Sequence, residues 1–479
     1  MVEDWGVPSM SVGIVKDGNL IYAWGFGTKE EGKAERPDQH TLYAIASNSK
    51  AFTSAIVAML VQEGKIDWDD RVQKYLPYFE IYDPFTSQQV TIRDLLCHRV
   101  GLGTFSGDII WYQSDFTAEE IIRRIKYLPQ AYPFRSGYGY SNLMYITAGE
   151  LIKSVTGKSW TENVEERIFA KIGMARSIVG PTQLEEMGNY AVPHELQNGQ
   201  TNRPIDWVDW TEVAATGGII SCVNDMAKWM QFNLENGVWN GDTLLTRESR
   251  NTLWTLHNNY TVDRYQPDEF NTHLSGYGLG WNLRDYDGHL FVGHTGGYDG
   301  MLTAVSLIPD EKLGVVVLTN GMKSPFMAAN YYLIDALLGR EERDWSQQQL
   351  ERFNQSEKDD KRIEERKQKQ MKGTHPSLNL EAYAGTYNSK IHGDIHVTQE
   401  DGSLRLEFKH APAFAATLEH WHYDVFELNW DIPSAWFSFG TIKFNLDNNL
   451  EVTGVDFDVP NDDIFFEELK AVRVSKSLD

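Results

Sequence analysis

The sequence has few cysteines, few basic residues relative to acidic ones, and no long hydrophobic run. Cys97 and Cys222 are its two cysteines, and neither belongs to a CxxC or histidine-rich cluster. We therefore interpret them as buried thiols and expect no metal site. Lys and Arg number 44 against 68 Asp and Glu, a formal net charge of -24, which repels phosphate backbones and makes a nucleic-acid partner unexpected. No apolar run approaches the roughly 20 residues of a membrane span.

The first residues, "MVEDWGVPSMSVGIV", enter a strand pattern almost at once and contain no recognisable signal peptide. Two locations stay open: the protein is periplasmic or secreted if an export signal was removed, and otherwise cytoplasmic.

The chain divides into three segments of different character. Residues 1–340 mix strands and helices, with a hairpin around residues 16–19 near the start and two apolar strands around residues 309–312 near the end. We expect these two ends to share one antiparallel sheet flanked by helices, an α/β (α+β) fold. Residues 341–375 contain 18 charged residues of 35 and are expected to form a solvated, partly helical linker.

Residues 376–479 alternate polar and apolar side chains with a period of two. The alternation continues on both sides of residues 400–402 and again around residues 447–449. This pattern predicts a small antiparallel β-barrel.

A candidate nucleophile occurs in "AIASNSKAFTSAIVAMLVQEG", where Ser47 precedes Lys50 by three residues. The apolar spacing that follows predicts a buried helix, so both side chains lie at its N-terminal end and on one face. Free N–H groups and the helix dipole stabilise an anion there. Taken alone, the pair is more typical of a capping serine with a surface lysine than of a catalytic pair.

Two later segments favour the catalytic interpretation. In "FRSGYGYSNLMYITAGEL", Tyr140 and Asn142 precede a predicted helix and can both project into one cleft. A phenol can transfer a proton, and a carboxamide can bind a substrate amide. In "FVGHTGGYDGM", a strand leads into His294, Thr295 and Gly297, where the N–H of Gly297 can join that of Ser47 to hold an oxyanion.

These three motifs resemble, in their order, those of the penicillin-recognising serine hydrolases. The motifs are Ser47-x-x-Lys50, Tyr140-Ser141-Asn142 and His294-Thr295-Gly296. The match is most similar to the branch of class C β-lactamases, DD-peptidases, D-aminopeptidases and related esterases, and it extends over most of residues 5–340. The C-terminal segment resembles the lipocalin-like appendage of some members. The resemblance implies a β-lactamase/transpeptidase-like domain followed by a lipocalin-like barrel.

The resemblance implies an acyl-enzyme mechanism. Ser47 attacks a carbonyl, Lys50 and Tyr140 handle its proton, and His294 adjusts Tyr140 or the substrate. Asn142, Thr295 and Gly297 bind substrate. Which of Lys50 and Tyr140 is the general base stays open. No cofactor is implied, and the expected partner is a small-molecule or short-peptide substrate, with a homo-oligomer also possible.

One departure from the family pattern concerns the substrate. β-Lactamases and carboxypeptidases of this family usually carry Lys where this chain has His294, and an imidazole is a poorer anchor for a carboxylate at pH 7. We therefore expect a peptidase or amidase for small substrates, including those that contain D-residues. The alternatives are a broad esterase, a weak β-lactamase and a non-hydrolytic penicillin-binding sensor.

Three other features have simpler interpretations. His420 and His422 in "HWHYD" are expected on the outer face of a strand, and Asp299 is expected to be an ordinary loop carboxylate. The aromatic segment "IDWVDW" (205–210) either lines a cleft or packs in the core.

Overall fold

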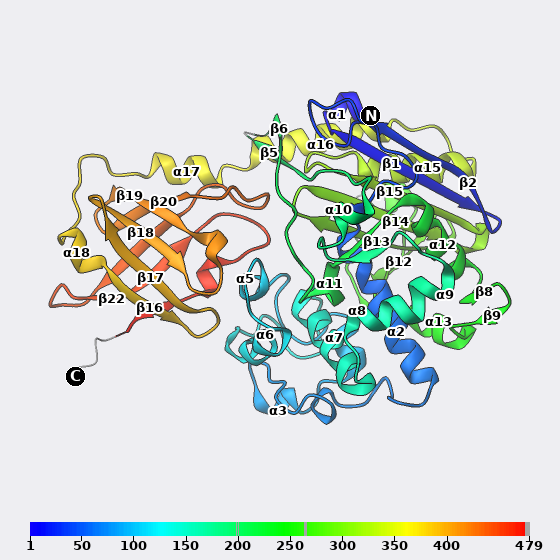
Figure 1. Ribbon diagram of the computed structural model, residues 1–479, viewed down its shortest axis with the longest axis horizontal. Helices are drawn as coiled ribbons and strands as arrows, with labels where there is room; N and C mark the ends of the chain where they lie inside the picture. The colour runs from blue at the N-terminus through cyan, green and yellow to red at the C-terminus, as the bar shows by residue number, and fades with distance from the viewer. Residues whose placement is uncertain (198, 200, 263–265, 475–479) are drawn as a thin grey trace.

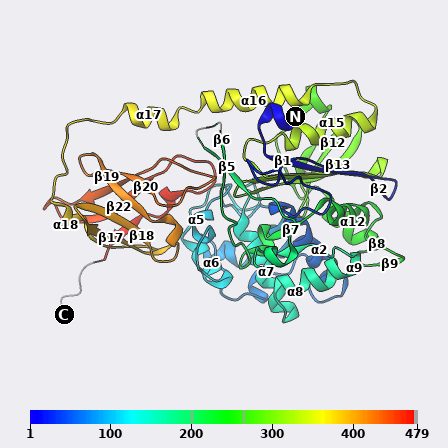
Figure 2. The ribbon, with the colours of Figure 1, turned by 45° about the horizontal axis from the view of Figure 1, so that its top comes forward.

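The computed structural model describes residues 1–197, 199, 201–262 and 266–474. A large α/β body and a separate β-barrel lie side by side, and a helical segment bridges them along one edge (Figures 1 and 2).

The larger body is built on an eight-stranded antiparallel sheet. Both ends of the segment contribute to it, because β1 pairs with β15 as well as with β2. The predicted shared sheet is thus confirmed. Its order is β10 (Asn258–Asn259), β11 (Ser275–Tyr277), β12 (Asn282–Tyr286), β13 (His289–Tyr298), β14 (Met301–Ile308), β15 (Leu313–Thr319), β1 (Ser9–Lys16) and β2 (Asn19–Gly27).

Helices cover both faces of this sheet because its central strands are apolar on both sides. Val315 and Val317 face α15 (Phe326–Leu338), whereas Val316 and Leu318 belong to the core shared with α12 (Val223–Leu234). The buried helices α2 (Ser49–Gln62) and α7 (Asn142–Thr156) pack against each other below that second face.

Shorter elements complete this body. They are α1 (Val2–Trp5), α3 (Pro84–Ser87), α4 (Ile92–Leu96), α5 (Asp108–Trp111), α6 (Ala118–Arg124), α8 (Trp160–Val164), α9 (Ala170–Ile172), α10 (Leu184–Met187), α11 (Ala214–Gly217), α13 (Arg247–Leu253) and α14 (Gln266–Phe270), with the short strands β3 (Tyr43–Ala44), β4 (Ile178–Val179), β5 (His194–Gln197), β6 (Thr201–Pro204), β7 (Ile219–Ser221), β8 (Val238–Trp239) and β9 (Asp242–Thr243).

The charged segment is helical, as predicted, but it is not merely a solvated linker. It forms α16 (Trp345–Asp359) and α17 (Arg362–Gln368). Trp345 is 1% exposed and donates a hydrogen bond to Asp335 at 2.7 Å. The sequence interpretation was incomplete because a single buried tryptophan fixes the start of an otherwise charged helix.

The C-terminal segment forms a closed eight-stranded antiparallel barrel, which confirms the predicted architecture. It begins with the short helix α18 (Leu380–Tyr383). Its strands are β16 (Gly385–Ser389), β17 (Gly393–Glu400), β18 (Ser403–Phe408), β19 (Ala416–His422), β20 (Val425–Trp430), β21 (Thr441–Leu446), β22 (Val452–Asp458) and β23 (Ala471–Arg473). Alternate side chains fill the interior, which explains the period of two.

The barrel is attached to the segment that carries α5. Glu468 accepts hydrogen bonds from the hydroxyl of Ser106 at 2.6 Å and the N–H of Gly107 at 2.7 Å. His410 contacts Asp115 through its side chain at 2.7 Å and through its carbonyl at 2.9 Å. These polar contacts fix two barrel loops against the α/β body.

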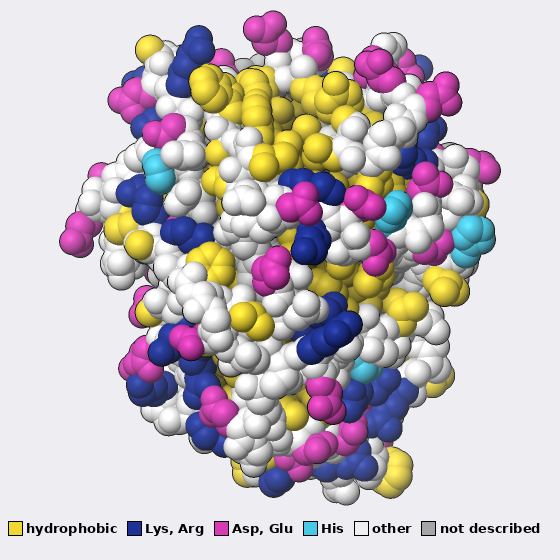
Figure 3. Space-filling view, turned by 90° about the vertical axis from the view of Figure 1, so that its right-hand side faces the viewer, with side chains coloured by type: hydrophobic (Ala, Val, Ile, Leu, Met, Phe, Trp, Pro, Cys, Tyr) yellow, Lys and Arg dark blue, Asp and Glu magenta, His cyan; other side chains and the backbone are white. Residues whose placement is uncertain are grey.

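The outer edge of the sheet is apolar. On β2, Ile21 is 55% exposed and Trp24 is 60% exposed, and Tyr22 and Phe26 are also exposed. The view onto this side shows hydrophobic side chains gathered near the top of the molecule (Figure 3).

Candidate active site

Ser47 lies in a single 3₁₀ turn (Ala46–Asn48) that leads directly into α2. Ala46 has a left-handed backbone, with φ of 48°, a conformation that costs a non-glycine residue on the order of 1 kcal/mol. Asn48 stabilises the turn by donating to the carbonyl of Ile45 at 2.9 Å and to the hydroxyl of Thr303 at 3.0 Å. The serine is therefore held in a strained, well-anchored turn, as nucleophiles commonly are.

Lys50 is fully buried and lies within hydrogen-bond distance of three oxygen atoms. Its Nζ lies 3.0 Å from Ser47 Oγ, 2.7 Å from Asn142 Oδ1 and 2.8 Å from the carbonyl oxygen of Thr216. Burial lowers the pKa of Lys50 well below its usual range, and the Asp108 carboxyl only partly opposes this effect. A lysine with such a depressed pKa is available as a neutral amine beside the serine.

Asn142, the first residue of α7, connects Lys50 to an acidic residue that the sequence did not reveal. Its Oδ1 also accepts from the Thr216 hydroxyl at 2.8 Å, and its Nδ2 donates to Asp108 at 2.6 Å. Burial raises the pKa of Asp108 to about 8, although hydrogen bonds from Trp111 and Asn142 oppose the rise. No local pattern marks Asp108, because tertiary packing brings α5 to the site.

Tyr140 faces the same serine from the loop before α7. The Lys50 amine lies 4.8 Å from the centre of its ring. Burial raises the pKa of Tyr140 well above 10, with a hydrogen bond to Ser47 opposing the rise. The phenol of Tyr140 therefore holds its proton at neutral pH.

His294 on β13 is buried and neutral. Its Nδ1 lies 2.6 Å from the carbonyl oxygen of Thr295, so this nitrogen carries the proton, and its Nε2 accepts from the Tyr277 hydroxyl at 2.8 Å. Burial, with Lys50 nearby, lowers the pKa of His294 to about 3. Tyr277, the last residue of β11, was not predicted as its partner.

The end of β13 passes directly beside the turn that holds Ser47. A β-carbon at Gly296 would lie 2.2 Å from the carbonyl oxygen of Ile45, so only glycine permits this approach. Pairing with β12 ends at Gly293, which leaves the edge at Thr295 and Gly297 facing the pocket.

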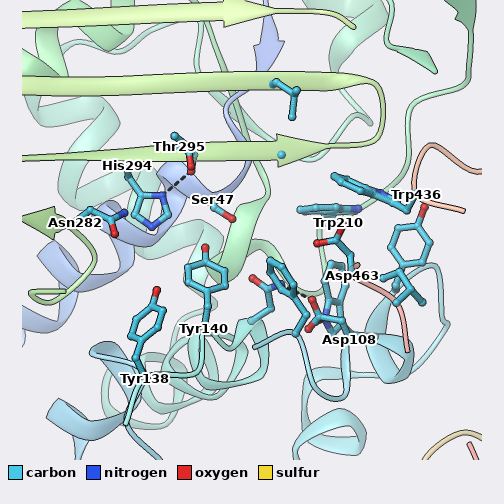
Figure 4. A pocket seen from close by; sticks show the side chains of 17 residues that line it. Ser47, Asp108, Tyr138, Tyr140, Trp210, Asn282, His294, Thr295, Trp436 and Asp463 are labelled. Atoms are coloured by element: carbon cyan, nitrogen blue, oxygen red, sulfur yellow. Dashed lines mark hydrogen bonds between the residues drawn. The ribbon is translucent and has the colours of Figure 1, made fainter. Parts of the chain in front are cut away.

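A pocket of about 360 Å³ joins these elements (Figure 4). Six of the seven predicted site residues line it, and Lys50 lies behind them in contact with Ser47 and Asn142. Its full lining is Ser47, Phe105, Asp108, Trp111, Tyr112, Tyr138, Tyr140, Asn142, Trp210, Asn282, His294, Thr295, Gly297, Leu302, Trp436, Asp463 and Ile464.

Asp299 is not an ordinary loop carboxylate, and that interpretation was wrong. It is 2% exposed and accepts hydrogen bonds from Tyr112 and, at 3.2 Å, from the indole of Trp436. Burial raises its pKa to about 6. The contact with the barrel, which buries this carboxylate, has no local signature in the sequence.

The remaining candidates have simpler outcomes. Trp210 lines the pocket, so its segment forms part of the cleft wall. His420 and His422 are half-exposed, and the described residues include no group of three or more His, Cys, Asp or Glu placed to hold a metal. No helix in the described ranges is both long and apolar enough to cross a bilayer.

The chain belongs to the β-lactamase family, whose model matches residues 1–338. This family and its hydrolase relatives make the protein a serine hydrolase. Residues 369–473 match a domain of unknown function, DUF3471.

Two relatives are described as unguisins hydrolases. The Unguisins hydrolase ungD of Aspergillus violaceofuscus is 27% identical over 88% of this chain and 80% of its own length. The ungD' protein of Aspergillus campestris is 30% identical over 70% of this chain and 63% of its own length.

Solved structures share the fold. The octameric penicillin-binding protein homologue from Pyrococcus abyssi has a TM-score of 0.64 at 22% identity, covering 98% of this chain and 97% of its own. The D-amino acid amidase from Ochrobactrum anthropi SV3, complexed with L-phenylalanine amide, has a TM-score of 0.58 at 22% identity, covering 70% of this chain and 94% of its own.

Proposed function

We propose that the protein hydrolyses small peptides or amides, including those with D-residues, through an acyl-enzyme on Ser47. The observation that carries this proposal is the fully buried Lys50 amine, 3.0 Å from Ser47 Oγ. We assign the hydrolase to residues 1–340, the connector to 341–375 and the barrel domain to 376–479.

In acylation, Lys50 acts as the general base. Its lowered pKa supports a neutral amine that accepts the hydroxyl proton as Ser47 Oγ bonds to the substrate carbonyl carbon. The raised pKa of Tyr140 supports the complementary role, in which the phenol donates its proton to the leaving nitrogen. The proton on Lys50 then returns to Tyr140, and the site is restored.

The remaining residues position the substrate and the charge. The N–H groups of Ser47 and Gly297 hold the oxyanion, and Asn142 orients Lys50 while its second amide hydrogen faces the substrate. Water attacks the acyl-enzyme in the second half-reaction, with Tyr140 and Lys50 transferring its proton. His294 orients the strand through Thr295 and Tyr277 rather than exchanging protons.

The neutral His294 disfavours substrates that need a carboxylate anchor. Its lowered pKa and its two occupied nitrogens leave no cation there for a β-lactam or a C-terminal carboxylate. The structural similarity to a D-amino acid amidase also supports amide chemistry, and the similarity to an unguisins hydrolase supports hydrolysis. A broad esterase and a weak β-lactamase remain the alternative activities.

A fluorophosphonate probe and an activated ester test the proposal together. We expect stoichiometric labelling of Ser47 and multiple turnovers of p-nitrophenyl acetate, with both lost in Ser47→Ala. Labelling without turnover would instead identify a penicillin-binding sensor. Unchanged hydrolysis by Ser47→Ala would contradict the assignment.

We also propose that the chain forms a homo-oligomer through the apolar edge of β2. A groove of about 660 Å³, lined by residues such as Val12, Tyr22 and Tyr332, lies beside this edge, and exposed apolar surface of this kind marks contact sites. The Pyrococcus abyssi homologue is described as octameric. Light scattering should show a smaller assembly for Trp24→Ser than for the wild type, whereas Tyr423→Ser on the barrel should not change it. Equal masses would refute this contact.

A further inference from the structure

The barrel supplies part of the wall of the active-site pocket. Trp436 comes from the loop between β20 and β21, and Asp463 and Ile464 come from the segment between β22 and β23. All three line the same pocket as Ser47, and Figure 4 shows Trp436 and Asp463 on the side that also carries Trp210 and Asp108. The pocket is therefore incomplete without the barrel.

Trp436 is fixed at this position by a buried carboxylate of the α/β body. Its indole N–H donates to Asp299 Oδ1 at 3.2 Å, and Tyr112 donates to the same oxygen. A β-carbon at Gly297 would lie 3.2 Å from the ring edge of Trp436, so the indole lies directly against the proposed oxyanion strand. The barrel loop thereby covers the part of the pocket next to the reacting carbonyl.

This wall is both aromatic and acidic. Trp111, Tyr112, Trp210 and Trp436 present rings to the pocket, and Asp108 and Asp463 present carboxyl groups. The two acids are close enough for Asp463 to raise the pKa of Asp108, and burial raises the pKa of Asp463 itself to about 6. None of the described lining residues is Lys or Arg.

A cation is the chemical group that satisfies this combination. It stabilises the ionised form of Asp463 beside the buried Asp108 carboxyl group, and it interacts favourably with the faces of tryptophan and tyrosine. A carboxylate in the same place would be repelled. The indole N–H of Trp210, a residue 7% exposed, has no acceptor among the described residues, so it is free to donate to a neutral part of a substrate.

We propose that the barrel completes the acyl subsite and that Asp463, with Trp436, selects substrates whose acyl part carries a protonated amine. This inference rests on the proposed hydrolase function of Ser47 and names its substrate class. The recognised group is an ammonium close to the scissile carbonyl, such as the free α-amine of an aminoacyl amide or a short peptide.

Matched pairs of substrates test this proposal in the full-length protein. Each pair consists of an amino-acid p-nitroanilide with a free amine and its N-acetylated counterpart, in both the D and the L series. We expect the wild type to prefer the free amine, as a ratio of kcat/KM values. Losing one charge-assisted contact should reduce that ratio about 10- to 100-fold in Asp463→Asn.

Asp456→Asn is the matched control on the barrel. Asp456 is 56% exposed and pairs with Lys443 outside the pocket, so the ratio should match that of the wild type. Asp463→Glu retains the charge and should recover at least part of the preference. Trp436→Ala should reduce the ratio as well, because it removes the ring that covers the subsite.

The outcomes separate this inference from the proposed function. If the wild type prefers the N-acetyl substrates, or if Asp463→Asn keeps the wild-type ratio while it remains folded by circular dichroism, the amine subsite is refuted although Ser47 still acts. If Asp463→Asn does not fold, an unchanged ratio in Trp436→Ala refutes the subsite. If neither substrate nor any activated ester is hydrolysed in a Ser47-dependent way, the proposed function itself fails.

Discussion

Replacing Lys50 by methionine separates the proposed catalytic role of this residue from its structural one. Methionine has a similar length and no charge, so it can occupy the same buried space. If Lys50 is the general base, Lys50→Met should lower kcat/KM for an activated ester by about 10²- to 10⁴-fold.

The stability of this variant should change little. Lys50 contacts Ser47 Oγ and donates to the carbonyl oxygens of Asn142 and Thr216. Of these two carbonyl oxygens, Asn142 Oδ1 keeps a second donor in the Thr216 hydroxyl. Leaving the Thr216 carbonyl unpaired costs about 1–3 kcal/mol. Methionine removes the desolvation cost of burying a polar amine, which stabilises the variant by about 1–3 kcal/mol on the mutational scale and offsets this loss. We therefore expect the melting temperature to shift by less than about 5 °C.

Ester kinetics and thermal unfolding measured on the same preparations check both parts. Lys65→Met is the matched control, because Lys65 lies just beyond α2 and pairs with Glu63 at the surface. Its activity and melting temperature should equal those of the wild type. If Lys50→Met keeps more than about a tenth of wild-type kcat/KM, a value far above the expected loss, Lys50 is not the base. A melting temperature lowered by 10 °C or more would show that its role is structural.

Four further predictions follow from the site. Tyr140→Phe combined with Lys50→Met should cost about as much activity as either change alone, because the proposed mechanism makes the two groups one proton-transfer unit; additive losses would argue against this. In a substrate panel, p-nitrophenyl esters and aminoacyl amides should be cleaved about 10- to 100-fold faster than cephalosporins or peptides ending in D-Ala-D-Ala, and the reverse order would show that His294 is misassigned. The pKa of His294 in the folded protein, about 3, lies below its value in the unfolded chain, so the unfolded state binds the extra proton as pH drops below about 6.5. The free energy of unfolding should therefore fall by up to about 1.4 kcal/mol per pH unit. Chemical denaturation of His294→Gln between pH 7 and pH 5 should show a smaller fall than the wild type, and an equal fall would contradict the neutral imidazole. Glu468→Ala removes the hydrogen bonds that this barrel residue accepts from Ser106 and from the N–H of Gly107. Amide hydrogen exchange at Gly107 should therefore become faster. Unchanged exchange would show that other contacts hold the barrel in place.

The sequence predicted the parts of the site that depend on local geometry. Ser47 and Lys50 lie three residues apart at a helix start, so helical geometry alone brings their side chains to one face. The glycines after His294 similarly indicate a close backbone approach, and Gly296 lies against the carbonyl of Ile45. The alternation of residues 376–479 was sufficient to predict a barrel.

The unpredicted parts depend on contacts between distant segments. Asp108, Tyr277, Asp299 and Trp436 become site residues only through packing between α5, the sheet and the barrel. Each is an ordinary residue in its local sequence, and Asp299 acquires its buried character from a partner 137 positions away. Periodicity and motif spacing carry no information about such pairings.

The most direct test of the central claim is detection of the acyl-enzyme. The full-length protein is mixed with a slowly hydrolysed amino-acid ester, quenched in acid within seconds and measured by intact mass spectrometry and peptide mapping. We predict a mass increase equal to the acyl group, located on the peptide that contains Ser47, and no increase in Ser47→Ala. An acyl group on any other residue, or Ser47-independent turnover without an adduct, would contradict the account.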